Sequence, residues 1–304
     1  RCQESEEIFV CPLPLYHIYA FTVNMLTFFS HGNLNVLIPN PRDIEAFVTA
    51  IKPFKFTGFS GINTLFVGLC QSPEFKNLDF SSLKFTMSGG SALTSGALGV
   101  WKEVTGCSIS EGYGLSETSP VLCINQPGKE VLGTVGKPLL ATDIRIWDEK
   151  NRTVEHGHTG QVVAKGPQVM KGYWNMPEET KKAIVRGYFR TGDIGQVEDD
   201  GSIRIVDRLK DMIIVSGFNV YPNEIEDVLA SHPCIIEAAV IGRDDDKTGE
   251  CVCAFIVLNE GMSVDQVREH CRESLTAYKV PKQVTFLTEL PKSTVGKVLR
   301  RELR

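Results

Sequence analysis

Residues 83–118 have the sequence LKFTMSGGSALTSGALGVWKEVTGCSISEGYGLSET, and this stretch decides the fold class. Alternating apolar residues over Leu83–Met87 predict a half-buried strand that leads into a Ser-Gly-Gly-Ser segment. A helix around Leu98 and Trp101 follows, and a second strand is predicted at residues 107–110. Strand and helix alternating at this spacing predict an α/β fold with a mostly parallel sheet covered by helices.

The same alternation extends toward the N-terminus. A strand is predicted at Ile8–Cys11, another at residues 56–59, and a helix begins at Asn63. Between the two strands, Asp43 is the predicted N-cap of a helix that Lys52-Pro53 ends. The apolar residues of that helix fall on one face, at Ile44, Phe47, Val48 and Ile51.

From about residue 130 the sequence changes to short strands and glycine-rich turns. Asp200-Gly201 lies between two apolar runs and predicts a hairpin, so this part forms a small antiparallel β-unit. The region from about residue 211 looks like an independent α+β unit, with a helix after Pro222. Within it, Ser263 and Gln266 form a capping box at the start of a further helix.

Composition excludes several classes of protein. The 304 residues include 42% hydrophobic and 23% charged residues, close to the average for globular chains, which argues against disordered or collagen-like sequence. The net charge of −5 gives no reason to expect nucleic-acid binding. The longest apolar stretch, Ile18–Phe29, is interrupted by Asn24 and is shorter than the ~20 residues of a membrane helix. We therefore predict a soluble protein.

The cysteines indicate free thiols. Their number, nine, is odd, their positions are scattered, and no Cys-x-x-Cys pair occurs. Most lie in apolar runs, so we expect buried thiols in a reducing compartment, with no disulfide framework and no zinc site.

The most informative stretch for chemistry is Glu111-Gly112-Tyr113-Gly114-Leu115-Ser116-Glu117-Thr118, which follows a predicted strand. Its glycines allow close approach of a ligand, and Tyr113 offers a flat face to a base. Ser116 and Thr118 offer hydroxyls to phosphate oxygens, and Glu117 offers a hard oxygen ligand to Mg²⁺. Taken alone, the stretch fits a capped glycine loop equally well.

Three further motifs carry charged residues. Asp193 follows Gly192 in a predicted turn and is suited to accept hydrogen bonds from ribose hydroxyls. The segment Asp207-Arg208-Leu209-Lys210-Asp211 ends the β-unit. Near the C-terminus, Lys297 follows glycine on a polar loop, from which it can reach into a cleft.

Together these motifs resemble the AMP-forming adenylate superfamily, which includes acyl-CoA synthetases, luciferases and peptide-synthetase adenylation domains. The resemblance covers essentially the whole chain, and Lys165–Met170 and Val215–Glu226 resemble bacterial long-chain fatty-acid–CoA ligases in particular. The motifs that carry it, in chain order, are Pro14-Leu15-Tyr16-His17, Ser88-Gly89-Gly90-Ser91, Gly112–Thr118, Thr191-Gly192-Asp193, Asp207–Lys210 and Pro291–Lys297.

The resemblance implies a domain organisation. Residues 1–207 would be the C-terminal part of the AMP-binding large domain, with a small β-barrel-like subdomain at about 130–207. Residues 208–211 would be a hinge, and residues 211–304 a mobile lid domain. The family's Ser/Thr/Gly-rich phosphate loop with its lysine is not found, so we expect a C-terminal fragment that is inactive or weakly active by itself.

The resemblance also implies an activity. A long-chain fatty acid would be activated by ATP to an acyl adenylate and then to acyl-CoA, with release of AMP and pyrophosphate. ATP, Mg²⁺ and coenzyme A would be required, and Mg²⁺ would bind Glu117. Catalytic roles are implied at Lys297, Glu117, Thr118 and His17. Nucleotide or coenzyme A contacts are implied at Gly89, Gly90, Gly112, Tyr113, Gly114, Asp193, Arg208, Lys210 and Gly217.

Alternatives stay open at this point. His17, in an apolar run, fits a core histidine as well as the mouth of an acyl pocket, and Lys210 fits a surface turn as well as the hinge. The alternatives to the long-chain ligase are an aryl- or medium-chain acid–CoA ligase and a non-catalytic fragment. We further expect a cytoplasmic location, and peripheral contact with the inner face of a membrane and a homodimer stay open.

Overall fold

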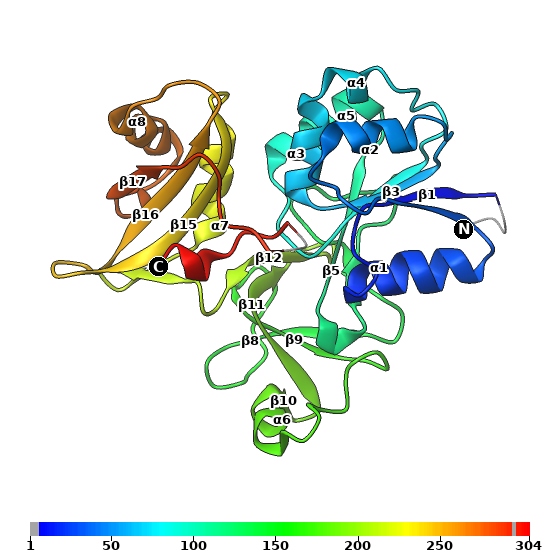
Figure 1. Ribbon diagram of the computed structural model, residues 1–304. Helices are drawn as coiled ribbons and strands as arrows, with labels where there is room; N and C mark the ends of the chain where they lie inside the picture. The colour runs from blue at the N-terminus through cyan, green and yellow to red at the C-terminus, as the bar shows by residue number, and fades with distance from the viewer. Residues whose placement is uncertain (1–5, 294–295) are drawn as a thin grey trace. The chain divides into compact units, whose positions relative to one another are not determined.

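The computed structural model describes residues 6–293 and 296–304, and the chain divides into two compact units (Figure 1). Unit 1 contains Arg1–Leu93, Ala97–Thr191 and Gly195–Ile205. Unit 2 contains Val206–Arg304 together with the short segments Thr94–Gly96 and Gly192–Ile194. Cys2, and Thr294 and Val295 of the C-terminal motif, lie outside the described residues.

Unit 1 is built on a seven-stranded sheet with the order β2-β1-β3-β4-β5-β6-β7. The first five strands in this order are parallel, and β6 and β7 are antiparallel, which confirms the predicted α/β class. The strands are β1 (Ile8–Cys11), β2 (Leu34–Leu37), β3 (Gly58–Gly61), β4 (Phe85–Ser88), β5 (Ile109–Gly114), β6 (Val121–Ile124) and β7 (Lys137–Pro138).

Helices cover both faces of this sheet. One face packs against α2 (Ile44–Ile51), α3 (Asn63–Gln71), α4 (Pro73–Lys76) and α5 (Ser95–Thr105), and the other against α1 (Ile18–Ala20) and the π-helical turn that continues it, Phe21–Phe28. Asp43 caps α2 as predicted, since its side chain accepts a hydrogen bond from Ala46 N. Trp101 is fully buried at the centre of the first face and donates to Thr86 Oγ1 at 3.1 Å. Over the described residues, none of the helices combines the length and the apolar character that crossing a membrane needs.

A second sheet has the order β10-β11-β9-β8, with β12 paired to β11. The Asp200-Gly201 turn joins β11 to β12 as predicted, because Asp200 Oδ1 accepts from Ser202 N at 2.9 Å and Gly201 has φ +82°. This sheet is the β-rich part predicted at about 130–207. Its elements are β8 (Asp143–Trp147), β9 (Gly160–Lys165), α6 (Pro177–Ala183), β10 (Ile184–Val185), β11 (Tyr188–Val197) and β12 (Ile203–Arg208).

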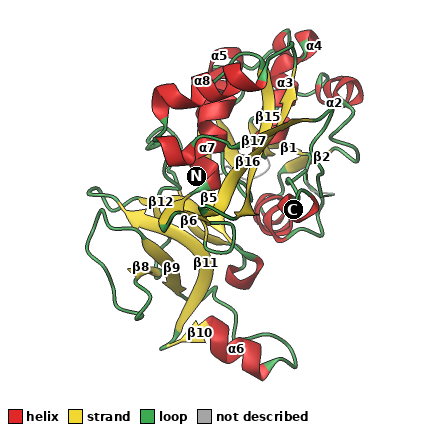
Figure 2. Ribbon diagram, turned by 90° about the vertical axis from the view of Figure 1, so that its left-hand side faces the viewer, coloured by secondary structure: helices red, strands yellow, loops and turns green. Residues whose placement is uncertain are grey.

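The core of unit 2 is a five-stranded sheet with the order β14-β13-β16-β15 and β17 paired to β16 (Figure 2). Helices α7 (Pro222–Ala230) and α8 (Val264–Ser274) pack on one face, and Leu290, Val298 and Leu303 of the C-terminal segment pack on the other. The capping box of α8 forms as predicted. The strands are β13 (Ile213–Val215), β14 (Phe218–Val220), β15 (Ile235–Asp245), β16 (Gly249–Leu258) and β17 (Gln283–Phe286).

Two segments predicted as loops or turns lie inside strands. Glu111–Gly114 belongs to β5, and Thr191–Asp193 belongs to β11, where Gly192 has φ +76°. The prediction was wrong because pairing with neighbouring strands supplies the hydrogen bonds of these glycine-containing segments, and local composition does not reveal a neighbour. At position 114 only glycine fits, because a Cβ there would lie 1.8 Å from Pro120 O.

The burial predicted for most of the cysteines is confirmed. Eight cysteines lie in the described part of the chain, and all are free thiols, most of them buried. Burial raises the pKa of Cys11 to about 11 and of Cys271 to about 11, so both are protonated near neutral pH.

Candidate functional site

Glycines of two adjacent parallel strands come together at the carboxyl end of β4. Ser88 lies opposite Glu111 in the β4–β5 register, and Gly89 and Gly90 follow directly. A Cβ on Gly89 would lie 3.4 Å from Gly112 O, whereas one on Gly90 would meet nothing within 4 Å. Open α/β sheets bind ligands at the carboxyl ends of their parallel strands. Because glycine has no side chain, a ligand at this place can approach the backbone closely.

Ser88 strengthens this candidate site, although the sequence analysis gave it no role of its own. The residue is 3% exposed, and its Oγ is one of three buried polar side-chain atoms without a hydrogen-bond partner in the described residues. An unsatisfied buried hydroxyl costs free energy that a polar ligand would recover. A purine edge beside Gly89 and Gly90 carries the donors and acceptors that such a hydroxyl needs, so the residues present fit an adenine nucleotide.

Glu111, opposite Ser88, was quoted from the sequence without a role. Burial raises the pKa of its carboxyl to about 7. Near neutral pH this group therefore exists partly as the protonated acid, which can donate a hydrogen bond as well as accept one.

Glu117 lies in a single 3₁₀ turn, Ser116–Thr118, after β5. Its Oε1 accepts from the Tyr173 hydroxyl at 2.9 Å, and its carbonyl accepts from Met170 N at 2.8 Å, so the residue is fixed from two directions. In the described part of the chain, no group of three or more His, Cys, Asp and Glu side chains could hold a metal. A single carboxylate fits Mg²⁺ that is held mainly by substrate phosphates and water.

Thr118 and His17 have structural partners in this region. The Thr118 hydroxyl is buried, accepts from Leu115 N at 2.9 Å and lies within hydrogen-bond reach of Pro120 O, so it stabilises the turn. His17 is the N-cap of α1, and its Nδ1 accepts from Tyr19 N at 3.3 Å. His17 is half-buried and caps α1, which does not decide between its two alternatives, and the catalytic roles of both residues stay predictions.

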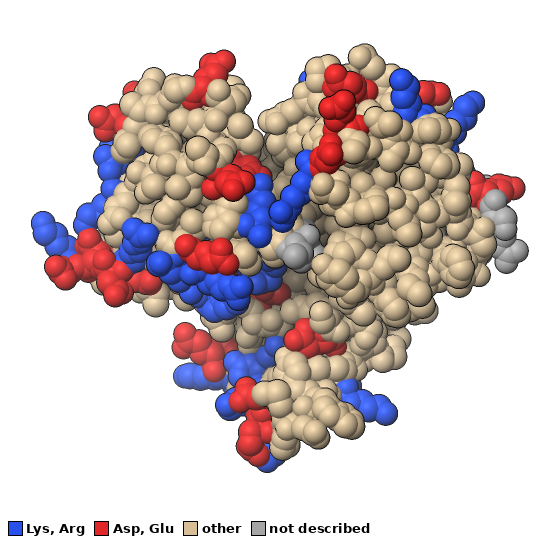
Figure 3. Space-filling view, in the orientation of Figure 1, with Lys and Arg blue, Asp and Glu red and all other residues tan. Residues whose placement is uncertain are grey.

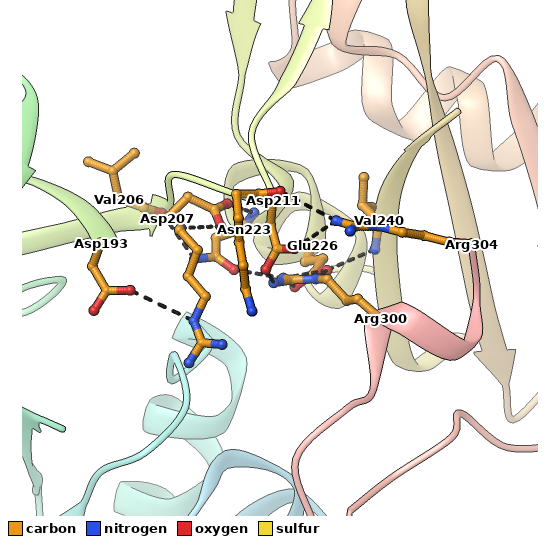
Figure 4. Close-up of polar contacts among 11 residues, drawn as sticks. Asp193, Val206, Asp207, Asp211, Asn223, Glu226, Val240, Arg300 and Arg304 are labelled. Atoms are coloured by element: carbon orange, nitrogen blue, oxygen red, sulfur yellow. Dashed lines mark hydrogen bonds and ion pairs between the residues drawn. The ribbon is translucent and has the colours of Figure 1, made fainter. Parts of the chain in front are cut away.

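Three of the predicted site residues come together in unit 2. Asp193 Oδ1 lies 3.7 Å from Arg208 Nε (Figure 4). The pKa of Lys297 is lowered to about 8, mainly by burial and further by the charges of Arg208, Arg300 and Lys210, while the charge of Asp193 opposes them. In the face drawn in Figure 3, Lys and Arg side chains gather on unit 2. Lys297 therefore lies in a positive potential suited to a phosphate-bearing ligand.

Lys297 lies on a short hairpin of the C-terminal segment. Leu299 N donates to Pro291 O at 2.8 Å, Ser293 N to Lys297 O at 2.9 Å, and Lys297 N to Ser293 Oγ at 3.2 Å. The backbone of the lysine is therefore fixed before any ligand binds, although the sequence placed it only on a polar loop.

Lys210 and Gly217 lie at the surface of unit 2. Ser216 and Gly217 have φ +51° and +83° and form the two-residue turn between β13 and β14, a conformation that favours glycine. Lys210 is exposed in the turn after β12. The predicted hinge at 208–211 stays a prediction.

A cavity of about 660 Å³ in unit 2 was not found from the sequence. Its lining includes Arg268, Arg272 and Lys282, and the Tyr278 ring, which stacks on Phe218 at 4.8 Å between centroids. The available signal was the pair of arginines four residues apart on one face of α8. The cavity is basic and partly aromatic, and it lies beside the hairpin that carries Gly217.

Sequence comparison shows that the chain belongs to the family of AMP-binding enzymes. Residues 1–174 match the AMP-binding enzyme family, and residues 224–297 match the AMP-binding enzyme C-terminal domain.

Individual relatives are similar over nearly all of the chain. A long-chain-fatty-acid–CoA ligase of Yersinia pestis is 47% identical over 304 residues, which cover 99% of this chain and 54% of the relative. The anthranilate CoA ligase AuaEII, solved with anthranoyl-AMP, has a TM-score of 0.93 at 31% identity. ATP-bound MatB from Rhodopseudomonas palustris has a TM-score of 0.89 at 33% identity. Each structural comparison covers 99% of this chain and 60% of the solved chain. The chain spans about half the length of the curated relatives that it matches.

Proposed function

We propose that the protein to which this chain belongs is an AMP-forming acid–CoA ligase that acts on long-chain fatty acids. The observation that carries the proposal is the partly buried Lys297 among Arg208, Arg300 and Asp193, because an ammonium group in this setting is suited to a phosphate. The 47% identity to a long-chain-fatty-acid–CoA ligase supports the choice of acid.

In the proposed first half-reaction, a carboxylate oxygen of the fatty acid attacks the α-phosphorus of ATP and pyrophosphate leaves. Lys297 would neutralise the charge that develops between the carboxylate and the α-phosphate. Asp193 would accept hydrogen bonds from the ribose hydroxyls, with Arg208 beside it. Gly89, Gly90 and Tyr113 would border the adenine, and Glu117 would hold Mg²⁺, whose positive charge would stabilise the phosphates.

In the proposed second half-reaction, the thiol of coenzyme A attacks the acyl carbon of the adenylate. The carbon–sulfur bond forms, AMP leaves, and the thiol proton passes to solvent. The Ser216-Gly217 turn would border the path of the pantetheine arm, since glycine has no side chain to obstruct it. The basic cavity of unit 2 would bind the phosphates of coenzyme A, because its walls carry three cationic side chains.

The coenzyme A site predicts a selective defect. Arg272→Ala should raise the KM for coenzyme A by about 5–20-fold, the loss expected for a charge-assisted hydrogen bond, and leave the KM for ATP unchanged. Steady-state thioester formation measures both constants, and Arg272→Lys, which keeps the charge, should retain most of the affinity. An equal rise in both KM values would contradict a coenzyme A site in this cavity.

One specific observation favours a second candidate, an aryl acid–CoA ligase. The solved structure with the TM-score of 0.93 is an anthranilate CoA ligase. The proposed chemistry and the roles of Lys297, Asp193 and Glu117 would be the same, and only the acid would differ.

A set of acids of increasing size separates the candidates. The full-length protein, with ATP, Mg²⁺ and coenzyme A, should form thioesters on C14–C18 fatty acids and release AMP and pyrophosphate. If thioesters form on aromatic acids alone, the proposed substrate class is wrong and the proposed reaction is right. No thioester on any acid would reject the enzymatic proposal in favour of a non-catalytic binding role.

A further inference from the structure

A partly buried ion-pair network lies at the end of the hairpin that carries Lys297 (Figure 4). Arg300 Nη2 donates to both carboxylate oxygens of Glu226, at 2.8 and 2.7 Å, and to Asn223 Oδ1 at 2.9 Å. Arg300 Nη1 lies 3.6 Å from Asp211 Oδ2. The Arg300 and Glu226 side chains are each 19% exposed, so these contacts are largely protected from solvent.

The network joins the hairpin to several elements of unit 2. Glu226 Oε1 also accepts from Val240 N at 2.8 Å, which fixes the carboxylate between α7 and β15. Asp207 Oδ2 accepts from Asn223 N at 2.8 Å, at the start of α7. Arg304 donates to Asp211 Oδ1 at 2.8 Å. The guanidinium of Arg300 therefore has partners whose positions are fixed by a helix, a strand and the segment after β12.

These contacts hold the Arg300 side chain in one orientation more firmly than a surface ion pair would. An exposed pair contributes little to stability and holds neither side chain in one position. Hydrogen bonds between a guanidinium and a carboxylate that are largely protected from solvent are directional. Loss of either group leaves the charge of the other uncompensated. Two residues, Val298 and Leu299, separate Arg300 from Lys297, and both are engaged by the hairpin or the core.

We propose that Arg300 is a positioning residue for Lys297. Held by Glu226, Asn223 and Asp211, it fixes the return arm of the hairpin, so that the lysine ammonium lies beside Asp193 and Arg208. The proposal rests on the proposed function, in which Lys297 acts on the α-phosphate.

The neighbouring arginine offers a matched control. Arg301 has the same side chain, but it is 79% exposed and its nearest carboxylate, that of Glu302, lies 3.9 Å away. In the full-length protein, Arg300→Met should lower kcat of ATP–pyrophosphate exchange by about 10–100-fold, the cost of a misplaced catalytic group, and change the KM for ATP much less. Arg301→Met should retain wild-type kcat. Equal losses in the two variants, or wild-type kcat in Arg300→Met, would overturn the proposal.

A second readout separates positioning from a general loss of fold. Removing the Arg300 cation should raise the pKa of Lys297, so the alkaline limb of kcat/KM should move to higher pH. Hydrogen–deuterium exchange should become faster over residues 290–304 in Arg300→Met and in the milder Glu226→Gln, and stay at the wild-type level in the rest of unit 2. Unchanged hydrogen–deuterium exchange in both variants would reject the proposal that Arg300 fixes the hairpin. If wild-type protein forms no adenylate on any acid, the proposed function fails. The hydrogen–deuterium exchange experiment still tests whether Arg300 fixes the hairpin.

Discussion

Lys297→Ala in the full-length protein should slow adenylate formation by about 10²–10³-fold, because a single preorganised charge at the developing transition-state charge is commonly worth that much. The other cation of the hairpin, Lys292, is paired with Glu237 at 2.6 Å, so we expect it not to replace the lost ammonium group. ATP–pyrophosphate exchange measures this half-reaction. Thioester formation from a synthetic acyl adenylate should stay close to the wild-type rate, since Lys297 is assigned only to the first half-reaction.

The lowered pKa of Lys297 predicts that the rate falls as the pH rises. The pKa of Lys297 is lowered to about 8, so the catalytically required ammonium form is lost as the pH rises through that value. The alkaline limb of kcat/KM, which reports the free enzyme, should therefore lie near pH 8. In kcat the limb should move to higher pH, because bound phosphate stabilises the ammonium form. A rate independent of pH from 7 to about 10 would contradict the assignment of the charge to Lys297.

Glu117→Gln should weaken Mg²⁺ activation of adenylate formation by about 10–100-fold or more, because an amide keeps the size of the side chain but loses the anionic ligand. Titration of ATP–pyrophosphate exchange with Mg²⁺ at saturating ATP measures the effect.

Tyr173→Phe is the matched control for Glu117. It removes the hydroxyl that donates to Glu117 Oε1 at 2.9 Å and leaves the carboxylate in place, so its effect should stay within about 10-fold. Equal Mg²⁺ dependence in wild-type protein and Glu117→Gln would rule out this carboxylate as the metal ligand.

Local signals in the sequence predicted several elements correctly. Asp43, Ser263 and the Asp200-Gly201 turn were all found because their hydrogen bonds join residues at most three positions apart. Strands were located less well: β3, β4 and β5 begin at residues 58, 85 and 109, where the pattern suggested 56, 83 and 107. Strand ends depend on the neighbouring strand, and apolar alternation carries no information about where that neighbour stops.

For the candidate site, the residue types and their order were visible in the sequence, and their surroundings were not. The orphaned hydroxyl of Ser88 and the raised pKa of Glu111 result from burial in the packed sheet. The basic cavity of unit 2 assembles residues of four elements and had only one weak local signal.

By itself, the sequence determined the family, the α/β class, the helix caps, the Asp200-Gly201 turn and which residues can carry the chemistry. Motifs and short-range hydrogen bonds are properties of neighbouring residues. Only the tertiary structure decided that Glu111–Gly114 and Asp193 lie in strands and that Lys297 is partly buried among charges. It also decided the partners of Arg300, because Asn223 is 77 positions away in the chain. Contacts over such distances depend on how the core packs, and packing brings together residues that no local pattern connects.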